Sequence, residues 1–566
     1  MRLWALALVC ASCAPARPAP TLTTFAEASG YKRTGRYDEV LTLCRDFARA
    51  YASVTCETIG ETTRGRPLVA LRVAKHANRP YLYVEGGIHS GEIEGKDAGF
   101  AFLRDLLDGK VAPGALDHVS LIFVPVLSPD GHEQWGPNNR PNQRGPEEMG
   151  FRTNGVRLNL NRDWVKTDTP EIQAAVGVLT KYDPVVLVDL HATDGAKFEH
   201  DIAVMMSPAS PRPDSLDETT AQLSARIQAR LTELGHLPLD FYPSFVDDER
   251  PHSGFATGEA PPRFSHAYMA MRGRIGVLVE THSWRTYKER AESTYHTLQA
   301  LFEEAVRNAD SWAAAARDAD AADAKLAGTA VPMTWKTDGT SREFEFRGYE
   351  YERRASELTG GVWLVYDESR PEIWRVPLYD SIEPAVTITA PGQGYIIDGG
   401  FARAVAALLD RHGIAYAPAT TRDVEVEAFR ADSVTFGAPY EGRTRPTITG
   451  VWAREKRTLD QGAIFVPIAQ RRARLIMHLF EPSLPDSLAQ WGAFNTVFER
   501  KEYAEPYVLE QAVRDMFAAS PALADEFSEF VSRTPSPSTD ARLDWIHRHH
   551  PSWDERLNLL PVYRLP

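Results

Sequence analysis

The chain is poor in cysteine and carries no excess of positive charge. Four of its 566 residues are cysteine, and its 63 lysines and arginines are outnumbered by 77 aspartates and glutamates, for a formal net charge of -14. Phosphate binding draws its affinity from clustered cations. Because the sequence has neither a basic balance nor a basic block, it argues against a nucleic-acid partner.

Long apolar runs are also missing after the N-terminal residues. No later run approaches the ~20 residues that a helix needs to cross a bilayer. A content of 43% apolar and 25% charged residues is typical of a globular protein. We therefore expect no transmembrane segment. At ~150 residues per domain the length predicts two to four domains, and two large ones are the working count.

The first twenty residues, "MRLWALALVCASCAPARPAP", have the composition of an export signal. Arg2 is followed by a short apolar stretch and then by small residues, an order typical of cleaved signals rather than of membrane anchors. We predict removal of residues 1–20 and a periplasmic or extracellular location. Lipid attachment at Cys13 is a less favoured alternative, because Cys10 stands where a lipoprotein signal normally has leucine.

Cys44 and Cys56 are the two cysteines beyond this signal. In an oxidising compartment they would form a disulfide that closes a short loop, and in a reducing one they would be two buried thiols. Both alternatives stay open, since pairing needs a geometry that the sequence does not give.

Strand patterns and helix patterns alternate between residues 30 and 310, which indicates an α/β sheet domain. The strand patterns are continuous apolar runs, as expected for strands that helices cover on both faces. We predict strands at 66–74, 80–85, 119–127, 184–190 and 274–280. Helical spacing of apolar residues predicts helices at 37–51 and 95–107.

The amino-acid pattern of the chain changes near residue 330. An alanine-rich helix pattern at 292–328 ends at a glycine and is followed by aromatic, strand-like pieces. We therefore predict one domain over 21–328 and a second, α+β accessory domain over 329–566. Within the second, residues 400–416 resemble a helix stopped by glycine, and the last hundred residues look largely helical.

Four residues with metal or acid-base chemistry follow predicted strands. His89 and Glu92 come after one strand, His191 after a second and Glu280 after a third. Ligands collect beyond the carboxyl ends of strands in such sheets. Two histidines and a carboxylate, with one position left to water, are the ligand set of a catalytic zinc site. Taken alone, the first pair is more often a chance surface turn. For His191, a hydrogen-bonded structural histidine is the less favoured alternative, because the other candidate residues accompany it.

Two further groups extend this hypothesis. Asp189 or Asp194 would orient a ring nitrogen of the histidine between them. In "LNLNRDW", Asn161 and Arg162 together suit a free carboxylate, because a guanidinium offers two parallel donors and the amide a third. The alternative is a surface arginine that pairs with Asp163 or with Glu171.

Five motifs in order resemble the zinc carboxypeptidases of the M14 type: "HSGE", "SPDG", "LNLNRDW", "DLHATDG" and "GVLVETHS". The resemblance covers about residues 30–310. It implies a mixed, mostly parallel eight-stranded sheet flanked by helices, one Zn²⁺ per chain, and a peptide substrate with a free C-terminal carboxylate. Residues 477–510 also resemble a tail found in bacterial exported M14-like proteins, which suggests an accessory domain without revealing its role.

The resemblance carries roles over by position. It implies that the metal ligands are His89, Glu92 and His191. It also implies that Asn161 and Arg162 bind the substrate carboxylate and that Glu280 is the catalytic carboxylate. Two departures stand out. Gly91 replaces an arginine of the digestive members, which puts the extended substrate site in doubt. Asn159 stands where many members have an aspartate that braces the first zinc histidine, which would weaken metal binding.

Two further roles are implied with alternatives. The arginine that polarises the scissile carbonyl corresponds to Arg152, with Arg140, Arg144 and Arg157 as competitors. The mobile tyrosine that faces the substrate corresponds to Tyr268, with Tyr242 as the alternative. Either residue could instead be a tyrosine packed in the core without a role in binding.

The sequence thus predicts a zinc metallocarboxypeptidase in which a glutamate acts as general base. One alternative is an amidase or deacylase of the same scaffold, acting on peptidoglycan stem peptides or acylated amino acids. Another is a catalytically inert peptide-binding protein of the cell envelope. The intact set of ligands, acid and base argues against the inert protein.

Overall fold

The computed structural model describes residues 21–193, 195–212, 214–419 and 423–566. The predicted export signal, with the alternative lipid site at Cys13, lies outside the described residues, and so does Asp194.

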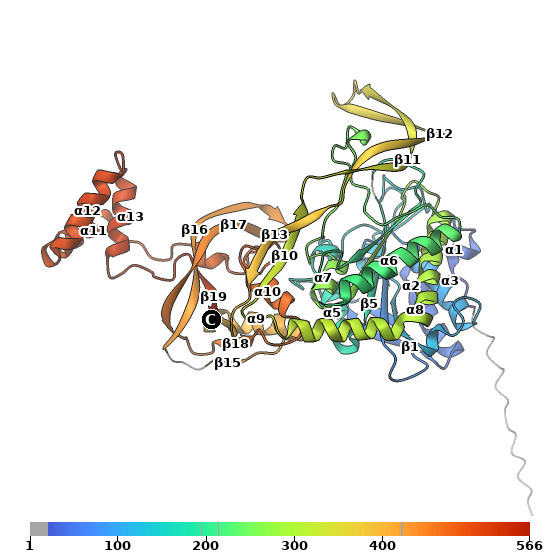
Figure 1. The fold of residues 1–566 in the computed structure, drawn as a ribbon, viewed down its shortest axis with the longest axis horizontal. Helices are drawn as coiled ribbons and strands as arrows, with labels where there is room; N and C mark the ends of the chain where they lie inside the picture. The colour runs from blue at the N-terminus through green and yellow to red at the C-terminus, as the bar shows by residue number, and fades with distance from the viewer. Residues whose placement is uncertain (1–20, 194, 213, 420–422) are drawn as a thin grey trace, which may run out of the picture.

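An eight-stranded sheet forms the centre of the N-terminal part, which lies on the right of Figure 1. Its strand order is β1-β2-β4-β3-β5-β9-β6-β7. Neighbouring strands from β4 to β9 are parallel, as are β6 and β7, whereas the other pairs are antiparallel. This confirms the predicted mixed, mostly parallel sheet. In sheet order, the strands are Val54–Glu61, Pro67–Val73, Ser120–Val124, Tyr81–Gly86, Val186–Ala192, Ile275–Thr281, Ile202–Ser207 and Pro238–Leu239.

Helices cover both faces of this sheet. Successive strand side chains point to opposite faces, so that Val186 and Val188 join one apolar core while Leu187 between them joins the other. The helices of the N-terminal part are α1 Phe25–Ala28, α2 Tyr37–Ala50, α3 Glu94–Leu107, α4 Pro129–His132, α5 Pro170–Tyr182, α6 Leu216–Glu233, α7 Ser265–Met271 and α8 Tyr287–Asp323. Because β5 and β9 are buried along their whole length, the sequence shows them as continuous apolar runs.

A disulfide joins α2 to β1. Cys44 and Cys56 are bonded, with their Cα atoms 5.3 Å apart. The structure therefore decides between the two alternatives of the sequence in favour of the disulfide.

The C-terminal part contains three kinds of unit. Strands β10 and β13 form a pair, β11 and β12 form a long hairpin, and six strands form a second sheet in the order β15-β18-β14-β19-β16-β17. In chain order, β10 to β19 are Ala330–Thr337, Arg342–Ala355, Val362–Tyr379, Ile382–Thr389, Gly394–Ile397, Ala417–Pro418, Asp423–Tyr440, Arg443–Thr458, Ile464–Pro467 and Leu559–Leu565. Helices α9 Gly399–His412 and α10 Ala473–Phe480 pack against this sheet.

Three further helices, α11 Pro506–Ala519, α12 Pro521–Arg533 and α13 Thr539–His549, project at the far left of Figure 1. The expectation of largely helical residues at the end of the chain is wrong for β19, which lies between β14 and β16 in the second sheet. The closing helix α8 ends at Asp323 rather than at the predicted Gly328.

The two parts of the chain share packing. Strand β8, Phe255–Ala256, pairs with the end of β12, and one apolar core contains residues of both parts, including Leu179 of α5 and Leu409 of α9. A domain boundary near residue 328 therefore stays a prediction. Among the helices that the structure describes, none combines the length and the apolar character needed to span a membrane.

Candidate metal centre and substrate pocket

The residues predicted at the strand ends lie together. His89 and Glu92 follow β3 in a turn that leads into α3, while His191 and Glu280 lie near the ends of β5 and β9. These two strands are parallel neighbours, and their register sets His191 opposite Glu280. Because β3, β5 and β9 run in the same direction, their carboxyl ends meet at one edge of the sheet.

The two histidines and Glu92 form a compact buried cluster. One ligand atom of each residue lies within 4.8 Å of the others. Nδ1 of His89 lies 3.2 Å from Oε1 of Glu92, and Nδ1 of His191 lies 2.8 Å from its Oε2. Both imidazoles therefore turn the same nitrogen toward one carboxylate, an arrangement that suits three ligands of one ion.

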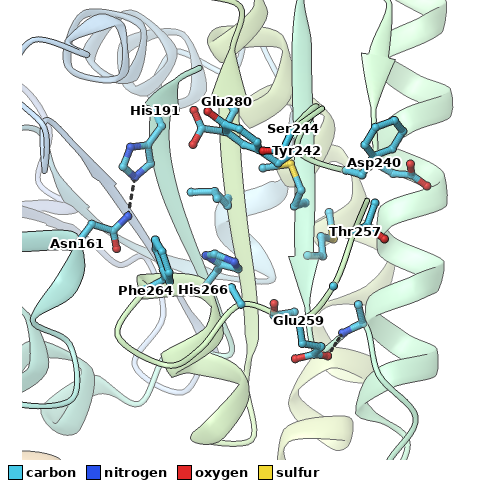
Figure 2. A pocket seen from close by; sticks show the side chains of 18 of the residues that line it. Asn161, His191, Asp240, Tyr242, Ser244, Thr257, Glu259, Phe264, His266 and Glu280 are labelled. Atoms are coloured by element: carbon cyan, nitrogen blue, oxygen red, sulfur yellow. Dashed lines mark hydrogen bonds between the residues drawn. The ribbon is translucent and has the colours of Figure 1, made fainter. Parts of the chain in front are cut away.

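The other nitrogen of each ring has its own partner. Nε2 of His89 lies 2.9 Å from Oδ1 of Asn159. Nε2 of His191 lies 2.8 Å from Oδ2 of Asp189 and 3.3 Å from Nδ2 of Asn161 (Figure 2). Such partners fix the tautomer and the direction of a metal-binding ring. Asp189, one of the two aspartates that the sequence offered for this role, has this position, and the other, Asp194, lies outside the described residues.

The electrostatics of the cluster suit a cation. Burial lowers the pKa of His89 to about 4, so this ring is neutral at pH 7. Burial alone would raise the pKa of Glu92, but Arg140 and the neighbouring imidazoles outweigh it and hold that pKa well below its usual range. Burial would lower the pKa of His191, and Asp189 overcomes this to hold it well above the ordinary value.

The residues present fit a zinc ion. Among the described residues, buried Nδ1 of His89 makes no well-aligned hydrogen bond, although Oε1 of Glu92 lies 3.2 Å away. Two buried imidazole nitrogens beside a carboxylate oxygen are a donor set that zinc prefers.

Two of the four candidate arginines lie at this site. Nη2 of Arg140 and Nη1 of Arg152 lie 3.0 and 3.3 Å from the same oxygen of Glu92. Arg152 also lines the cavity described below. The competitor Arg144 pairs instead with Glu368, and Arg157 is exposed elsewhere on the surface.

The "NR" pair is held by a short turn. Oδ1 of Asn161 accepts the backbone N–H of Ser265 at 3.0 Å. The guanidinium of Arg162 donates from Nη1 to the Asn161 carbonyl at 2.7 Å, and its face lies 4.2 Å from the ring centre of Phe264. Burial lowers the pKa of this arginine from its usual value. Both members of the pair line the cavity.

The alternative of a surface arginine with an acidic partner is wrong for Arg162. Asp163 pairs with Lys166, and Glu171 accepts a bond from Asn154. Within the ranges that the structure describes, no carboxylate lies at ion-pair distance from this guanidinium. A half-buried cation without an acidic partner is suited to bind an anion from outside the chain.

The prediction for Tyr268 is wrong. This residue is completely buried, and its hydroxyl lies 2.7 Å from Nδ1 of His412 and accepts a bond from Arg272. His266, two residues earlier on α7, lines the cavity instead. Residues two positions apart on a helix point to nearly opposite sides, so the tyrosine faces away. The alternative, Tyr242, does line the cavity together with Glu280 (Figure 2).

One cavity of about 590 Å³ contains these groups. Besides the metal cluster, its walls come from β6, from two segments around residues 240–244 and 256–264, and from Leu378, Asp380 and Ile382 where β12 leads into β13. Glu259 at the far end accepts the backbone N–H groups of Ala209 and Ser210 at 2.8 and 2.6 Å (Figure 2). These segments carry no motif, so the sequence did not reveal their role.

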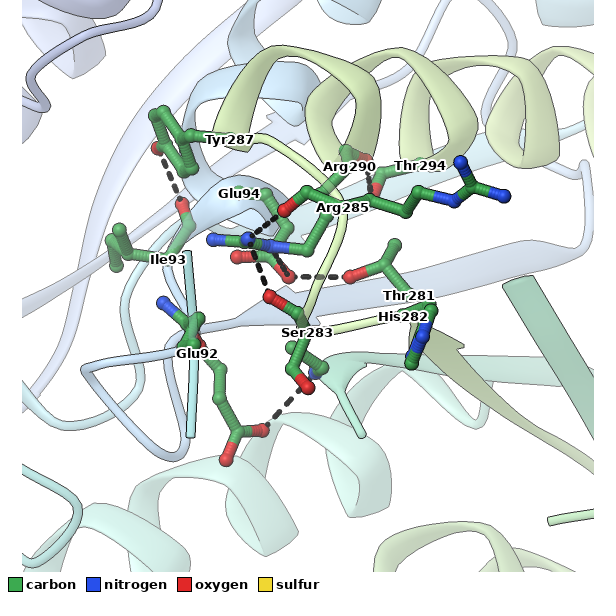
Figure 3. A network of polar contacts seen from close by, with 12 residues as sticks. Glu92, Ile93, Glu94, Thr281, His282, Ser283, Arg285, Tyr287, Arg290 and Thr294 are labelled. Atoms are coloured by element: carbon green, nitrogen blue, oxygen red, sulfur yellow. Dashed lines mark hydrogen bonds and ion pairs between the residues drawn. The ribbon is translucent and has the colours of Figure 1, made fainter. Parts of the chain in front are cut away.

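A buried polar network supports the site from behind (Figure 3). Thr281, next to the predicted base, donates to Oε1 of Glu94 at 2.6 Å. Arg290 of α8 lies 3.4 Å from the same carboxylate and donates to the Ser283 carbonyl. The network joins the start of α3 to the carboxyl end of β9, and so holds Glu92 at a fixed distance from that end of the strand.

Comparison with known proteins agrees with this geometry. Residues 40–232 match the family model described as zinc carboxypeptidase, Peptidase_M14. None of the curated proteins compared with the chain matches it. Glu280 and the loops of the pocket wall lie beyond the matched segment.

Solved structures similar to this chain include three carboxypeptidases. A metallo-carboxypeptidase from Pseudomonas aeruginosa is 16% identical, with 47% of this chain and 68% of that one covered and a TM-score of 0.37. A metallo-carboxypeptidase from Burkholderia cenocepacia is 16% identical, with 47% of this chain and 68% of that one covered and a TM-score of 0.36. Carboxypeptidase A from Helicoverpa armigera is 15% identical, with 50% of this chain and 74% of that one covered and a TM-score of 0.37. TM-scores of this size do not establish a common overall fold.

The sheet, the buried cluster and the matched segment together define a metal-dependent hydrolase. Over residues 40–232, which include the three cluster residues, the chain matches the M14 zinc carboxypeptidase family. The metal of this family is zinc, and the cluster of His89, Glu92 and His191 is positioned to hold it.

Proposed function

We propose that this chain is a metallocarboxypeptidase that hydrolyses the C-terminal peptide bond of peptides. One observation carries the proposal: a metal-ligand cluster, a carboxylate and an arginine without an acidic partner line the same cavity. The first two suit amide hydrolysis, and the third suits a substrate with a free carboxyl end.

His89, Glu92 and His191 would hold the zinc ion. When bound, zinc supplies a Lewis acid that polarises a carbonyl group and makes water more acidic. Asn159 and Asp189 keep the two imidazoles in the tautomer that leaves Nδ1 for the ion.

Glu280 is the proposed general base. It is 8% exposed and lies opposite His191 in the sheet register, at the wall of the cavity. Its carboxylate takes a proton from the attacking water and then gives a proton to the leaving amine. A general base of this kind typically contributes 10²–10⁴-fold to the rate.

Three further side chains act on the substrate. Asn161 and Arg162 bind the terminal carboxylate through N–H donors, which places the last peptide bond beside the base. Arg152 reaches the cavity from the side of Glu92 and donates to the carbonyl oxygen as negative charge develops on it. An interaction that grows in the transition state accelerates the reaction.

The test is Glu280→Gln, with Glu526→Gln on the exposed face of α12 as the matched control. We expect kcat on a peptide with a free C-terminal carboxylate to fall by about 10²–10⁴-fold. Zinc content, measured by elemental analysis, should be unchanged, and the control should behave as wild type. Near-full activity of Glu280→Gln would contradict the assigned role.

A parallel assay separates the carboxypeptidase from an amidase or deacylase of the same scaffold. Peptides with an amidated C-terminus should be cleaved poorly, because they lack the anion that Arg162 binds. Equal cleavage of free and amidated peptides, or faster cleavage of murein fragments, would favour the alternative. An absence of stoichiometric zinc in the purified protein would favour an inert binding protein.

We also propose that the chain is exported. The disulfide between Cys44 and Cys56 supports this, because such bonds persist mainly in oxidising compartments. Fractionation of expressing bacteria, with detection of the processed N-terminus by mass spectrometry, tests the export.

We further propose that residues 21–328 form the metallopeptidase domain and residues 329–566 an accessory domain.

A further inference from the structure

The tip of the β16–β17 hairpin lies on the turn that carries the proposed carboxylate clamp. The hydroxyl of Tyr440 accepts a hydrogen bond from Nε of Arg162 at 3.2 Å. Oε2 of Glu441 accepts the backbone N–H of Asn159 at 2.8 Å. Arg443 pairs with Asp168 at 2.6 Å, just after the turn. Residues from a distant part of the chain thus contact the substrate site.

The hairpin tip has a conformation that glutamate disfavours. Glu441 and Gly442 form a two-residue loop, and both have positive φ, 48° and 74°. Loops of this kind prefer Asn-Gly, because asparagine tolerates the left-handed region far better than glutamate does. A glutamate at this position, with its carboxylate on the Asn159 N–H, indicates that the contact outweighs the turn preference.

The ring of Tyr440 is fixed by the C-terminal part of the chain. It stacks on Trp491 with 6.0 Å between ring centres and 13° between planes. Arg445 lies 4.7 Å from the Trp491 ring centre. The hydroxyl that accepts from Arg162 is therefore supported by a packed platform rather than by a loose loop.

Arg162 is consequently held on three sides. Tyr440 accepts from Nε, the Asn161 carbonyl accepts from Nη1, and Phe264 lies against the face of the guanidinium. None of these partners is charged. They orient the cation but leave its charge for an incoming anion, and a side chain fixed beforehand loses less entropy when the anion binds.

We infer that Tyr440 and Glu441 are positioning residues for recognition of the substrate's terminal carboxylate. The C-terminal part of the chain thereby completes the substrate site. Tyr440 sets the direction of the Arg162 guanidinium, and Glu441 holds the backbone of the turn in place through Asn159. The inference rests on the proposed function, because it assigns the clamp a carboxylate ligand.

Two substitutions test this inference. Tyr440→Phe keeps the stacking on Trp491 and removes only the acceptor. Glu441→Asn removes the carboxylate but suits the turn better, so the hairpin is expected to fold. Tyr503→Phe is the matched control, because it removes a phenol hydroxyl from an exposed tyrosine far along the chain.

The expected signature is a change in KM rather than in kcat. For a peptide with a free carboxylate, each substitution should raise KM about three- to tenfold with kcat nearly unchanged, as expected for binding energy that substrate and transition state share. For the amidated peptide, KM should not change. In an Arg162→Ala background, Tyr440→Phe should have no further effect, because residues that act through one contact are not additive.

A binding measurement distinguishes failure of the inference from failure of the proposed function. Calorimetry on the Glu280→Gln protein compares the free and amidated forms of one peptide, with and without Tyr440→Phe. If wild type does not cleave peptides, the proposed function fails, but loss of the preference for the carboxylate on Tyr440→Phe would still support the inference. Unchanged preference in both hairpin variants, or equal weakening for both peptides, would overturn it.

Discussion

Replacing Asn159 by aspartate should strengthen zinc binding. The side-chain oxygen of Asn159 lies 2.9 Å from Nε2 of His89 and also accepts the backbone N–H of Asn161 at 3.0 Å. Aspartate keeps both bonds, with nearly the same shape. It exchanges a neutral acceptor for a charged one, and bonds to a charged acceptor are roughly twice as strong.

The size of the effect follows from this exchange. A neutral hydrogen bond contributes about 1 kcal/mol, so doubling it adds about 1 kcal/mol, or about fivefold in Kd. Partners of metal-binding histidines typically change metal affinity by about 10–100-fold when removed. We therefore expect Asn159→Asp to tighten zinc binding by about 5–10-fold and Asn159→Ala to weaken it by about 10–100-fold.

The same substitution should cost stability when the metal is absent. Asn159 is 7% exposed, so an added carboxylate would be buried beside the neutral imidazole of His89 in the metal-free protein. We expect the metal-free aspartate variant to be less stable by about 1–3 kcal/mol. The difference in Tm between metal-free and zinc-loaded protein should therefore grow.

The assay is competition for zinc with a chromophoric chelator at constant pH, supported by thermal unfolding of both forms. The alanine variant tests whether the contact acts on the metal at all. If alanine weakens zinc binding and aspartate leaves it unchanged, the charge of the acceptor is immaterial. If neither variant changes the affinity, the contact of this residue with His89 does not act on the metal.

Three further outcomes follow from contacts away from the metal. Burial raises the pKa of Glu171 from 4.5 to about 7. The folded state of the wild-type protein therefore loses stability as pH rises through this window. In urea unfolding, Glu171→Gln should be more stable than wild type at pH 8, by up to about 3 kcal/mol, but not at pH 4. Tyr268→Phe leaves Nδ1 of His412 without its partner and should lower stability by about 1–3 kcal/mol with kcat and KM unchanged. Reduction of the bond between Cys44 and Cys56 should lower the free energy of unfolding by about 3 kcal/mol, and an unchanged Tm with reductant would contradict this.

The strands of the first sheet could be predicted because burial on both faces leaves a local record. A strand such as β5 that touches two layers of helices is apolar along its length, and the residues just beyond such strands meet at one edge. The amino-acid pattern alone was therefore enough to place His191 and Glu280 together. The turn of His89 and Glu92 followed from the same rule.

The errors arise where position depends on contacts distant in the chain. The sequence around Tyr268 does not show that α7 turns this residue toward α9 and His266 toward the cavity. Both faces of that helix are buried, so polarity does not distinguish them. The pocket wall at 240–264 consists mainly of loops, apart from the two-residue strand β8, and its sequence shows no periodicity. The contact of Tyr440 with Arg162 joins residues 278 positions apart, and nothing local in either segment encodes it.

Strand β19 constrains the order in which the chain can assemble as it is synthesised. All strands of the first sheet have emerged by Thr281, whereas the second sheet needs Leu559–Leu565 between β14 and β16. The earlier strands of that sheet stay without this neighbour until Leu559–Leu565 has been synthesised, and unpaired strand edges favour wrong pairing in the meantime. The first sheet and its helices can fold earlier, and they then offer a surface against which the second sheet can pack.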